Sequence, residues 1–198
     1  MLLLAPVLVA LALAVLRGGS FSNLADLPLR GISLVALGLA LQIVLYLPGV
    51  RTAPAVATHG GVLYLATLVP IVVGALRNWR LGLAARVATL GLLLNTLVIA
   101  ANGGHMPTNG TAMRAVRGPA TVRDIADRRH FDNTHLATPA TRLVALSDII
   151  PVPFPPGAGN VYSVGDVLLA AGIAALAYQA TWRTSSTTAT GTSHHHVA

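Results

Sequence analysis

Long apolar stretches dominate this chain, and they constrain its fold more than any other feature. Of its 198 residues, 54% are hydrophobic and only 10% are charged, whereas a soluble domain carries about 25% charged residues. So few polar side chains cannot cover the surface of an ordinary cytosolic domain. The composition therefore predicts an all-α integral membrane protein whose first partner is the lipid bilayer.

Five stretches approach the length of about 20 apolar residues that an α-helix needs to cross a bilayer. The predicted transmembrane helices cover residues 2–16, 32–47, 60–76, 81–101 and 164–180. No positive charge precedes the first apolar run, which favours a retained helix over a cleaved signal peptide. We expect one membrane domain over residues 1–183 and a disordered Ser-, Thr- and Gly-rich tail over residues 184–198.

The arginines predict how the helices cross the membrane. Arg17 and Arg30 follow the first predicted span, Arg77 and Arg80 follow the third, and Arg183 follows the fifth. Because positive charge accumulates in short cytoplasmic loops, we expect a multi-pass protein of the cell inner membrane with its C-terminus in the cytoplasm. The N-terminus and an ordered outer cap, residues 103–162, then lie outside.

The net charge of +7 does not indicate a nucleic-acid partner, because the arginines are scattered between apolar runs. The chain has no cysteine, which excludes disulfides and thiolate metal sites. No motif for a cofactor is present, and we predict none. Other membrane proteins are possible partners of this chain.

The outer cap is predicted to contain one short amphipathic helix. Thr138 suits the N-cap and Pro139 the first helical position. A helix over residues 139–150 would place Leu143, Leu146 and Ile150 on one face. The prolines at positions 151, 153, 155 and 156 then predict an extended segment that returns to the membrane.

Three histidines and an aspartate in the cap have side chains that can bind a metal: His105, His130, Asp132 and His135. Such donors would suit a hydrolytic zinc site. The spacing of the last three does not put them on one helix face, however. We therefore favour solvated loop residues over a metal site.

Five polar residues in or near the predicted spans are the candidates for ligand binding: Gln42, Asn95, Arg142, Asp148 and Asp166. Arg142 and Asp148 are expected to form an ion pair that braces the cap, with binding of an anionic headgroup as the alternative. Asp166 stands three residues after Ser163, the spacing of a capping box, which we favour over a proton relay. The two amides are interpreted as hydrogen-bonding contacts between helices rather than ligands.

Several segments resemble a known bacterial membrane family. They are Arg17-Gly-Gly-Ser20, Asn102-Gly-Gly-His-Met-Pro107, Asp148-Ile-Ile-Pro151 and Ser163-Val-Gly-Asp166. They are similar to the family catalogued as domain of unknown function 5317, over about residues 16–175. The resemblance implies a multi-span bacterial membrane protein and carries no activity or catalytic residues to transfer.

Two functions follow as hypotheses from these observations. The first is a non-catalytic accessory or interaction module of a membrane complex. The alternative is a unit that binds or transports a small ligand, such as a quinone, a lipid headgroup or an anion, between the cap and the spans. The alternative requires a pocket on which the candidate residues converge. A histidine-based metalloenzyme is the weakest hypothesis.

Overall fold

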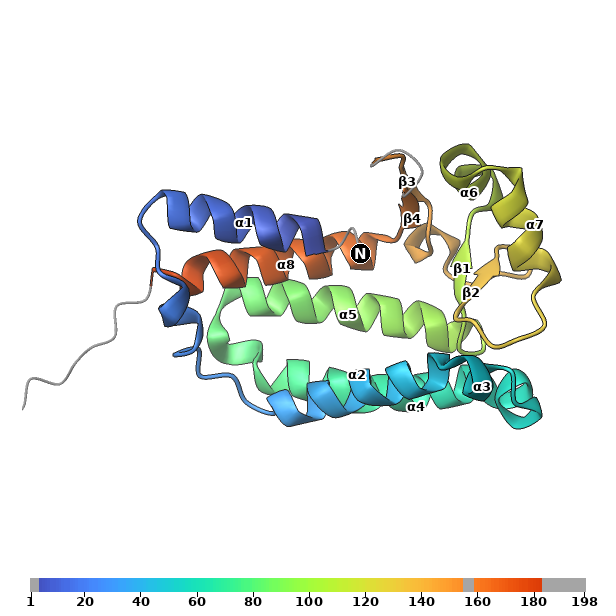
Figure 1. Ribbon diagram of the computed structural model, residues 1–198, viewed down its shortest axis with the longest axis horizontal. Helices are drawn as coiled ribbons and strands as arrows, with labels where there is room; N and C mark the ends of the chain where they lie inside the picture. Colours follow the sequence, from blue (N-terminus) through green and yellow to red (C-terminus); the bar gives the residue numbers. More distant parts are fainter. Residues whose placement is uncertain (1–3, 155–158, 183–198) are drawn as a thin grey trace, which may run out of the picture.

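The computed structural model describes residues 4–154 and 159–182. Most of these residues are helical and form an elongated bundle with a small mixed layer of helices and strands at one end (Figure 1). The bundle helices are α1 (Leu4–Leu16), α2 (Ile32–Tyr46), α4 (Pro54–Arg77), α5 (Leu83–Ala101) and α8 (Val164–Ala180). Short helices connect them: η1 (Phe21–Leu24), α3 (Pro48–Arg51) and η2 (Trp79–Leu81).

Each predicted span corresponds to one bundle helix. The largest difference is at α4, which begins at Pro54, six residues before the predicted start at Gly60. Proline at the first helical position has no N–H to leave unpaired and a backbone angle suited to a helix. The predicted start at residue 2, Arg183 and the tail over 184–198 lie outside the described residues.

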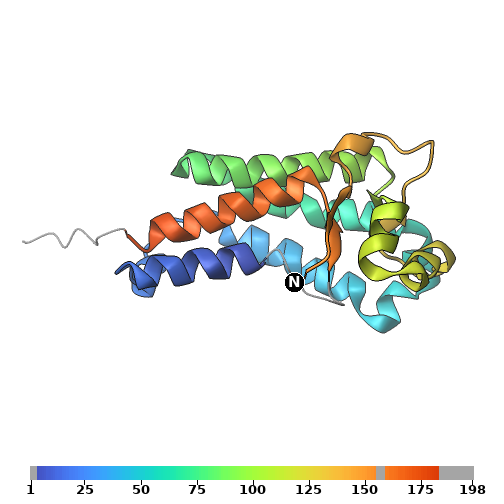
Figure 2. The same cartoon turned by 90° about the horizontal axis from the view of Figure 1, so that it is seen from above.

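The bundle helices pack side by side in an order that differs from their order along the chain. α1 packs on α8, α8 on α5, α5 on α4 and α4 on α2 (Figures 1 and 2). The tightest approach is between α5 and α8, through Gly91, Gly165 and Gly172. A Cβ atom at Gly165 would overlap the Asn95 side chain, and one at Gly172 would overlap the backbone of Ala88. Small residues allow helices to pack this closely in apolar surroundings.

The outward faces of the bundle are apolar. Ile43 and Val62 are each 67% exposed, Val69 is 60% exposed and Leu97 is 53% exposed. Two helical segments are long and apolar enough to cross a membrane. They are Pro54–Leu81, which joins α4 and η2, and Leu83–Ala101, which is α5. Three shorter apolar helices accompany them: Val7–Leu16, Ile32–Tyr46 and Val164–Ala180.

The cap, residues 103–162, closes one end of the bundle, and its described residues, 103–154 and 159–162, include two small sheets and two α-helices. β1 (Met106–Thr108) pairs in parallel with β2 (Thr134–Leu136), and β3 (Ile150–Val152) pairs antiparallel with β4 (Asn160–Tyr162). Between β1 and β2 lie α6 (Gly110–Arg117) and α7 (Pro119–Asp127). Met113, Ile125 and Val161 form the buried centre of this layer.

The predicted amphipathic helix over 139–150 is wrong. This segment forms turns, the single-turn helix η3 (Val144–Leu146) and the start of β3. Leu143 has a left-handed backbone with φ of 56°, which interrupts a helix. The side chain of Asn102, the residue that follows α5, accepts from the Arg142 N–H and donates to the Arg142 carbonyl, so this backbone bonds to Asn102 rather than within a helix.

The predicted extended proline segment is observed only in part. Pro151 lies in β3, where it pairs with Val161 of β4. The residues at 155 and 156 lie outside the described part of the chain.

Candidate functional site

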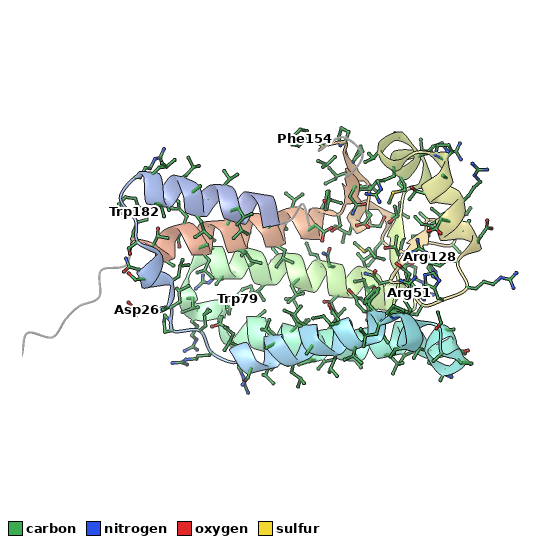
Figure 3. The ribbon with its side chains drawn as sticks, in the orientation of Figure 1. Asp26, Arg51, Trp79, Arg128, Phe154 and Trp182 are labelled. Atoms are coloured by element: carbon green, nitrogen blue, oxygen red, sulfur yellow. The ribbon has the colours of Figure 1, made fainter. Side chains whose placement is uncertain are left out.

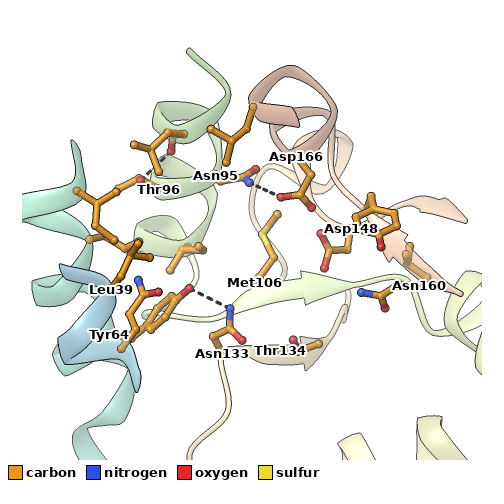
Figure 4. Close-up of a pocket in the computed structure, with 18 residues that line it drawn as sticks. Leu39, Tyr64, Asn95, Thr96, Met106, Asn133, Thr134, Asp148, Asn160 and Asp166 are labelled. Carbon is orange, nitrogen blue, oxygen red and sulfur yellow. Dashed lines mark hydrogen bonds between the residues drawn. The ribbon is translucent and has the colours of Figure 1, made fainter. Parts of the chain in front are cut away.

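A pocket of about 520 Å³ lies where the bundle meets the cap (Figure 4). α2, α4, α5 and α8 contribute its apolar walls, and the cap closes it with residues of β1, β2 and β4. The lining residues are Leu39, Gln42, Tyr64, Leu68, Ile71, Leu92, Asn95, Thr96, Ile99, Met106, Asn133, Thr134, Asp148, Asn160, Val161, Tyr162, Asp166 and Leu169. Apolar walls with a few polar groups are the usual composition of a small-molecule site.

One wall of the pocket is a hydrogen-bonded network that joins α5 to the start of α8. Ser163 Oγ accepts from the Asp166 N–H at 2.8 Å, and Asp166 Oδ2 accepts from the Ser163 N–H at 3.2 Å. This confirms the predicted capping box. Asn95 adds two bonds of 2.7 Å, because its Nδ2 donates to Asp166 Oδ1 and its Oδ1 accepts from Ser163 Oγ. Asn95 is therefore the interhelical contact that the sequence predicts.

Asp148 is a polar residue of the pocket whose hydrogen bonding is incomplete. Its Oδ2 accepts a 3.1 Å bond from the Thr108 hydroxyl, while Oδ1 is buried and has no partner among the described residues. Burial, and to a smaller extent the charge of Asp166, raise the pKa of Asp148 to about 7. Burial raises a carboxyl pKa because it disfavours the charged form. Asp148 therefore gains or loses a proton near neutral pH.

Tyr64 of α4 and Asn133 of the cap line the opposite wall, and Tyr46 of α2, which does not line the pocket, bonds to Asn133. Tyr46 donates from its hydroxyl to Asn133 Oδ1 at 2.7 Å, and Asn133 Nδ2 donates to the Tyr64 hydroxyl at 3.3 Å. Both tyrosine rings contact Phe131. Figure 4 shows Tyr64 and Asn133 across the pocket from Asp148 and Asp166.

The charged residues that line the pocket are both acidic. Asp148 and Asp166 line it, and among the described residues no Arg, Lys or His does. This distribution disfavours an anion as the occupant, because an anion would be repelled by both carboxylates.

Four of the five candidate residues meet at this pocket, although the sequence separates them by up to 124 positions (166 − 42). They are Gln42, Asn95, Asp148 and Asp166. Gln42 lines the pocket without a hydrogen-bond partner among the described residues. Arg142 is exposed and lines no part of the pocket.

The predicted ion pair between Arg142 and Asp148 is wrong. Arg128 forms two ion pairs, with Asp124 and Asp132 at 2.6 Å each, and Arg142 takes part in neither. The hydrogen bonds from Asn102 tether Arg142 by its backbone, and Thr108 is the partner of Asp148 instead. A neutral hydroxyl costs less to bury beside Asp148 than a guanidinium would.

The histidines of the candidate metal set separate into two places. His105 and His135 stack with ring centroids 3.7 Å apart, and burial followed by the charge of His105 lowers the pKa of His135. His130 instead accepts a 2.6 Å bond from Arg51. Within residues 4–154 and 159–182 the structure contains no group of three or more potential metal ligands.

Sequence reasoning missed Thr108, Asn133 and Tyr64 as part of this site. Tyr64 had a detectable signal, since a hydroxyl inside an apolar helix requires a partner. Thr108 and Asn133 lie in loop-like sequence where polar residues are ordinary, so nothing in the chain alone distinguished them.

The fold and the site together define a mostly helical protein with apolar outer faces and a mixed polar pocket beneath a cap. The chain belongs to a family of unknown function, DUF5317, whose model matches residues 26–178. The comparisons with curated proteins and with solved structures found no match.

Proposed function

We propose that this protein is a five-span inner-membrane protein that binds a small amphipathic ligand in the pocket between bundle and cap. The polar end of the ligand would carry hydrogen-bond donors or a positive charge, as an amine does. The convergence of Gln42, Asn95, Asp148 and Asp166 on one pocket carries this proposal. Nothing among the described residues specifically favours the simpler role of accessory module.

Membrane insertion of all five helices is supported by exposure and by the positions of the arginines. Apolar side chains that are more than half exposed, such as Ile43, Val69 and Leu97, would be unfavourable in water and favourable in lipid. α2 and α8 measure about 22 Å and 26 Å at 1.5 Å per residue. Local thinning of the bilayer accommodates spans that are shorter than its hydrocarbon core of about 30 Å.

The direction of insertion follows from the two ends of the bundle. Arg17, Arg30, Arg77 and Arg80 lie in or beside the turns at the end away from the cap. The excess of positive charge in cytoplasmic loops supports a cytoplasmic location for those turns and an outward-facing cap.

The chemistry of the pocket supports the ligand class. Leu39, Leu92 and Leu169 provide an apolar wall for the body of the ligand. The unpartnered oxygen of Asp148 and the free amide of Gln42 provide acceptors for its polar end. An ammonium group beside Asp148 would remove the cost of burying that carboxylate, because opposite charges nearby favour the ionised form.

Native mass spectrometry of the full chain, purified from its own membrane in mild detergent, tests the proposal. We expect a bound small molecule on the wild type that is lost in Thr96→Phe, whose ring fills the pocket. Leu97→Phe, one residue along α5 and facing outward, is the matched control and should retain the molecule. A wild-type protein that carries no small molecule, or equal retention in both variants, would contradict the proposal.

A further inference from the structure

A second polar site lies at the opposite end of the bundle, where two turns bring three arginines together. Arg30 lies before the start of α2. Arg77 is the last residue of α4, and Arg80 lies in η2, between α4 and α5. Two adjoining hollows of about 290 and 550 Å³ share these three arginines in their lining. Figure 3 shows Trp79 at this end, far from Arg51 and Arg128 at the cap end.

Asn78 holds the two turns in register. Its Oδ1 accepts from the Arg30 N–H at 2.9 Å, and its Nδ2 donates to the Arg30 carbonyl at 2.8 Å and to the Gly74 carbonyl at 2.8 Å. Gly31, with φ of +71°, leaves room for the Arg77 side chain above it. The Arg30 backbone is therefore positioned by hydrogen bonds that do not involve its charge.

Among the described residues, no carboxylate lines either hollow. Arg30, Arg77 and Arg80 are exposed and take part in neither described ion pair. Asp26 lies at the same end of the bundle (Figure 3) but lines neither hollow. Three like charges around one space repel one another, and an anion between them would relieve that repulsion.

The larger hollow is apolar on its other side. Leu76, Trp79 and Leu93 line it, and the first two are 46% and 39% exposed. Tryptophan is enriched where the hydrocarbon of a bilayer meets the headgroups. Guanidinium groups bind phosphate oxygens in pairs. A molecule with a phosphate next to an acyl chain matches both halves of this surface.

We propose that Arg30, Arg77 and Arg80 bind the phosphate of an anionic phospholipid, with its acyl chain against Leu76, Trp79 and Leu93. The site is separate from the pocket beneath the cap, and it rests on the membrane placement but not on the ligand of that pocket. Clusters of basic residues beside a transmembrane helix attract anionic lipids.

Lipid titration of the full chain in detergent, followed by native mass spectrometry, tests this inference. The probes are phosphatidylglycerol, phosphatidylcholine and inorganic phosphate. We expect phosphatidylglycerol to bind at least tenfold more tightly than phosphatidylcholine, and the triple variant R30Q/R77Q/R80Q to lose that preference. The control R114Q/R123Q/R129Q removes three exposed arginines of the cap and should keep it.

The outcomes separate the sources of the anion. Equal binding of the two lipids to the wild type, or an unchanged preference in R30Q/R77Q/R80Q, would overturn the inference. Tight binding of inorganic phosphate without a preference for phosphatidylglycerol would also overturn it, because the site would then bind free phosphate. If the triple variant does not fold, Arg77→Lys replaces it, and we expect this variant to weaken phosphatidylglycerol binding several-fold while leaving phosphatidylcholine binding unchanged.

Discussion

Two aspartates in one pocket show how neighbouring residues of the same type acquire different properties. Asp166 accepts from the Ser163 backbone and from Asn95, and it lies at the positive end of the α8 dipole. Asp148 has only the Thr108 hydroxyl and an unpartnered oxygen. The first carboxylate has hydrogen-bond partners at both of its oxygens, whereas the charged form of the second is destabilising because it is buried with one oxygen unpartnered.

Asp148→Asn should therefore raise stability above neutral pH. Because the pKa of Asp148 rises from 3.8 to about 7 on folding, the folded state holds its proton more tightly than the unfolded state. The contribution of Asp148 to stability should be largest below about pH 4 and fall as the pH rises to about 7, by at most about 4 kcal/mol. Thermal unfolding in detergent, measured from pH 5 to 8, should show a smaller loss in the variant.

Thr108→Val is the control for this experiment. It removes the one hydrogen bond that lowers the Asp148 pKa and keeps the shape of a fully buried side chain. Its stability should fall more steeply with pH than that of the wild type. The same pH dependence in wild type and Asp148→Asn would show that Asp148 does not titrate in the folded protein between pH 5 and 8.

At the scale of the elements, the contact between α5 and α8 positions half of the pocket. Gly165 lets α8 approach Asn95 closely enough for that amide to bond Ser163 and Asp166. Gly91 faces Gly165 from the other helix. Helix packing and the polar network at the pocket therefore depend on the same positions.

Gly165→Ala should destabilise the protein by about 1–3 kcal/mol, since the added methyl overlaps Asn95 and forces a shift. The variant should also lose the ligand in the mass-spectrometric assay, because Asn95 lines the pocket. Gly49→Ala is the control. Gly49 lies in α3 with no atom within 4 Å of an added Cβ, so the change should be neutral or slightly stabilising. Equal melting temperatures for the two variants would contradict the close packing.

Considered as a whole, the molecule has two chemically different ends joined by an apolar middle. Two acids line the pocket where the bundle meets the cap, and three arginines lie together at the far end. The connecting helices expose apolar side chains along their length. In a membrane, the hydrocarbon core of the bilayer would surround the apolar middle, and headgroups and water would surround the two ends.

The absence of native cysteine makes this arrangement testable with single-cysteine variants in intact cells. Thr111→Cys on α6 should react with a membrane-impermeant maleimide, whereas Ser22→Cys in η1 should react only after the cells are permeabilised. Val69→Cys, on a side chain that is 60% exposed, should remain unlabelled because lipid covers it. Rapid labelling of Val69→Cys, or the reverse pattern at the other two positions, would refute the proposed insertion.

Local sequence features predicted the elements that depend on local chemistry. The apolar runs locate the five bundle helices to within a few residues, except at the start of α4, because helix formation in apolar segments needs no partner beyond the segment itself. The Ser163 and Asp166 capping box could also be predicted, since both of its hydrogen bonds are made within one turn.

The tertiary structure decided everything that depends on distant residues. The spacing of Leu143, Leu146 and Ile150 fits a helix, yet Asn102, forty residues before Arg142, bonds that backbone and prevents it. The partner of Asp148 is Thr108 and not Arg142, because the cap folds β1 beside it. Hydrophobicity and capping act over a few residues and can be read along the chain, whereas hydrogen bonds between segments exist only after the helices and the cap have packed.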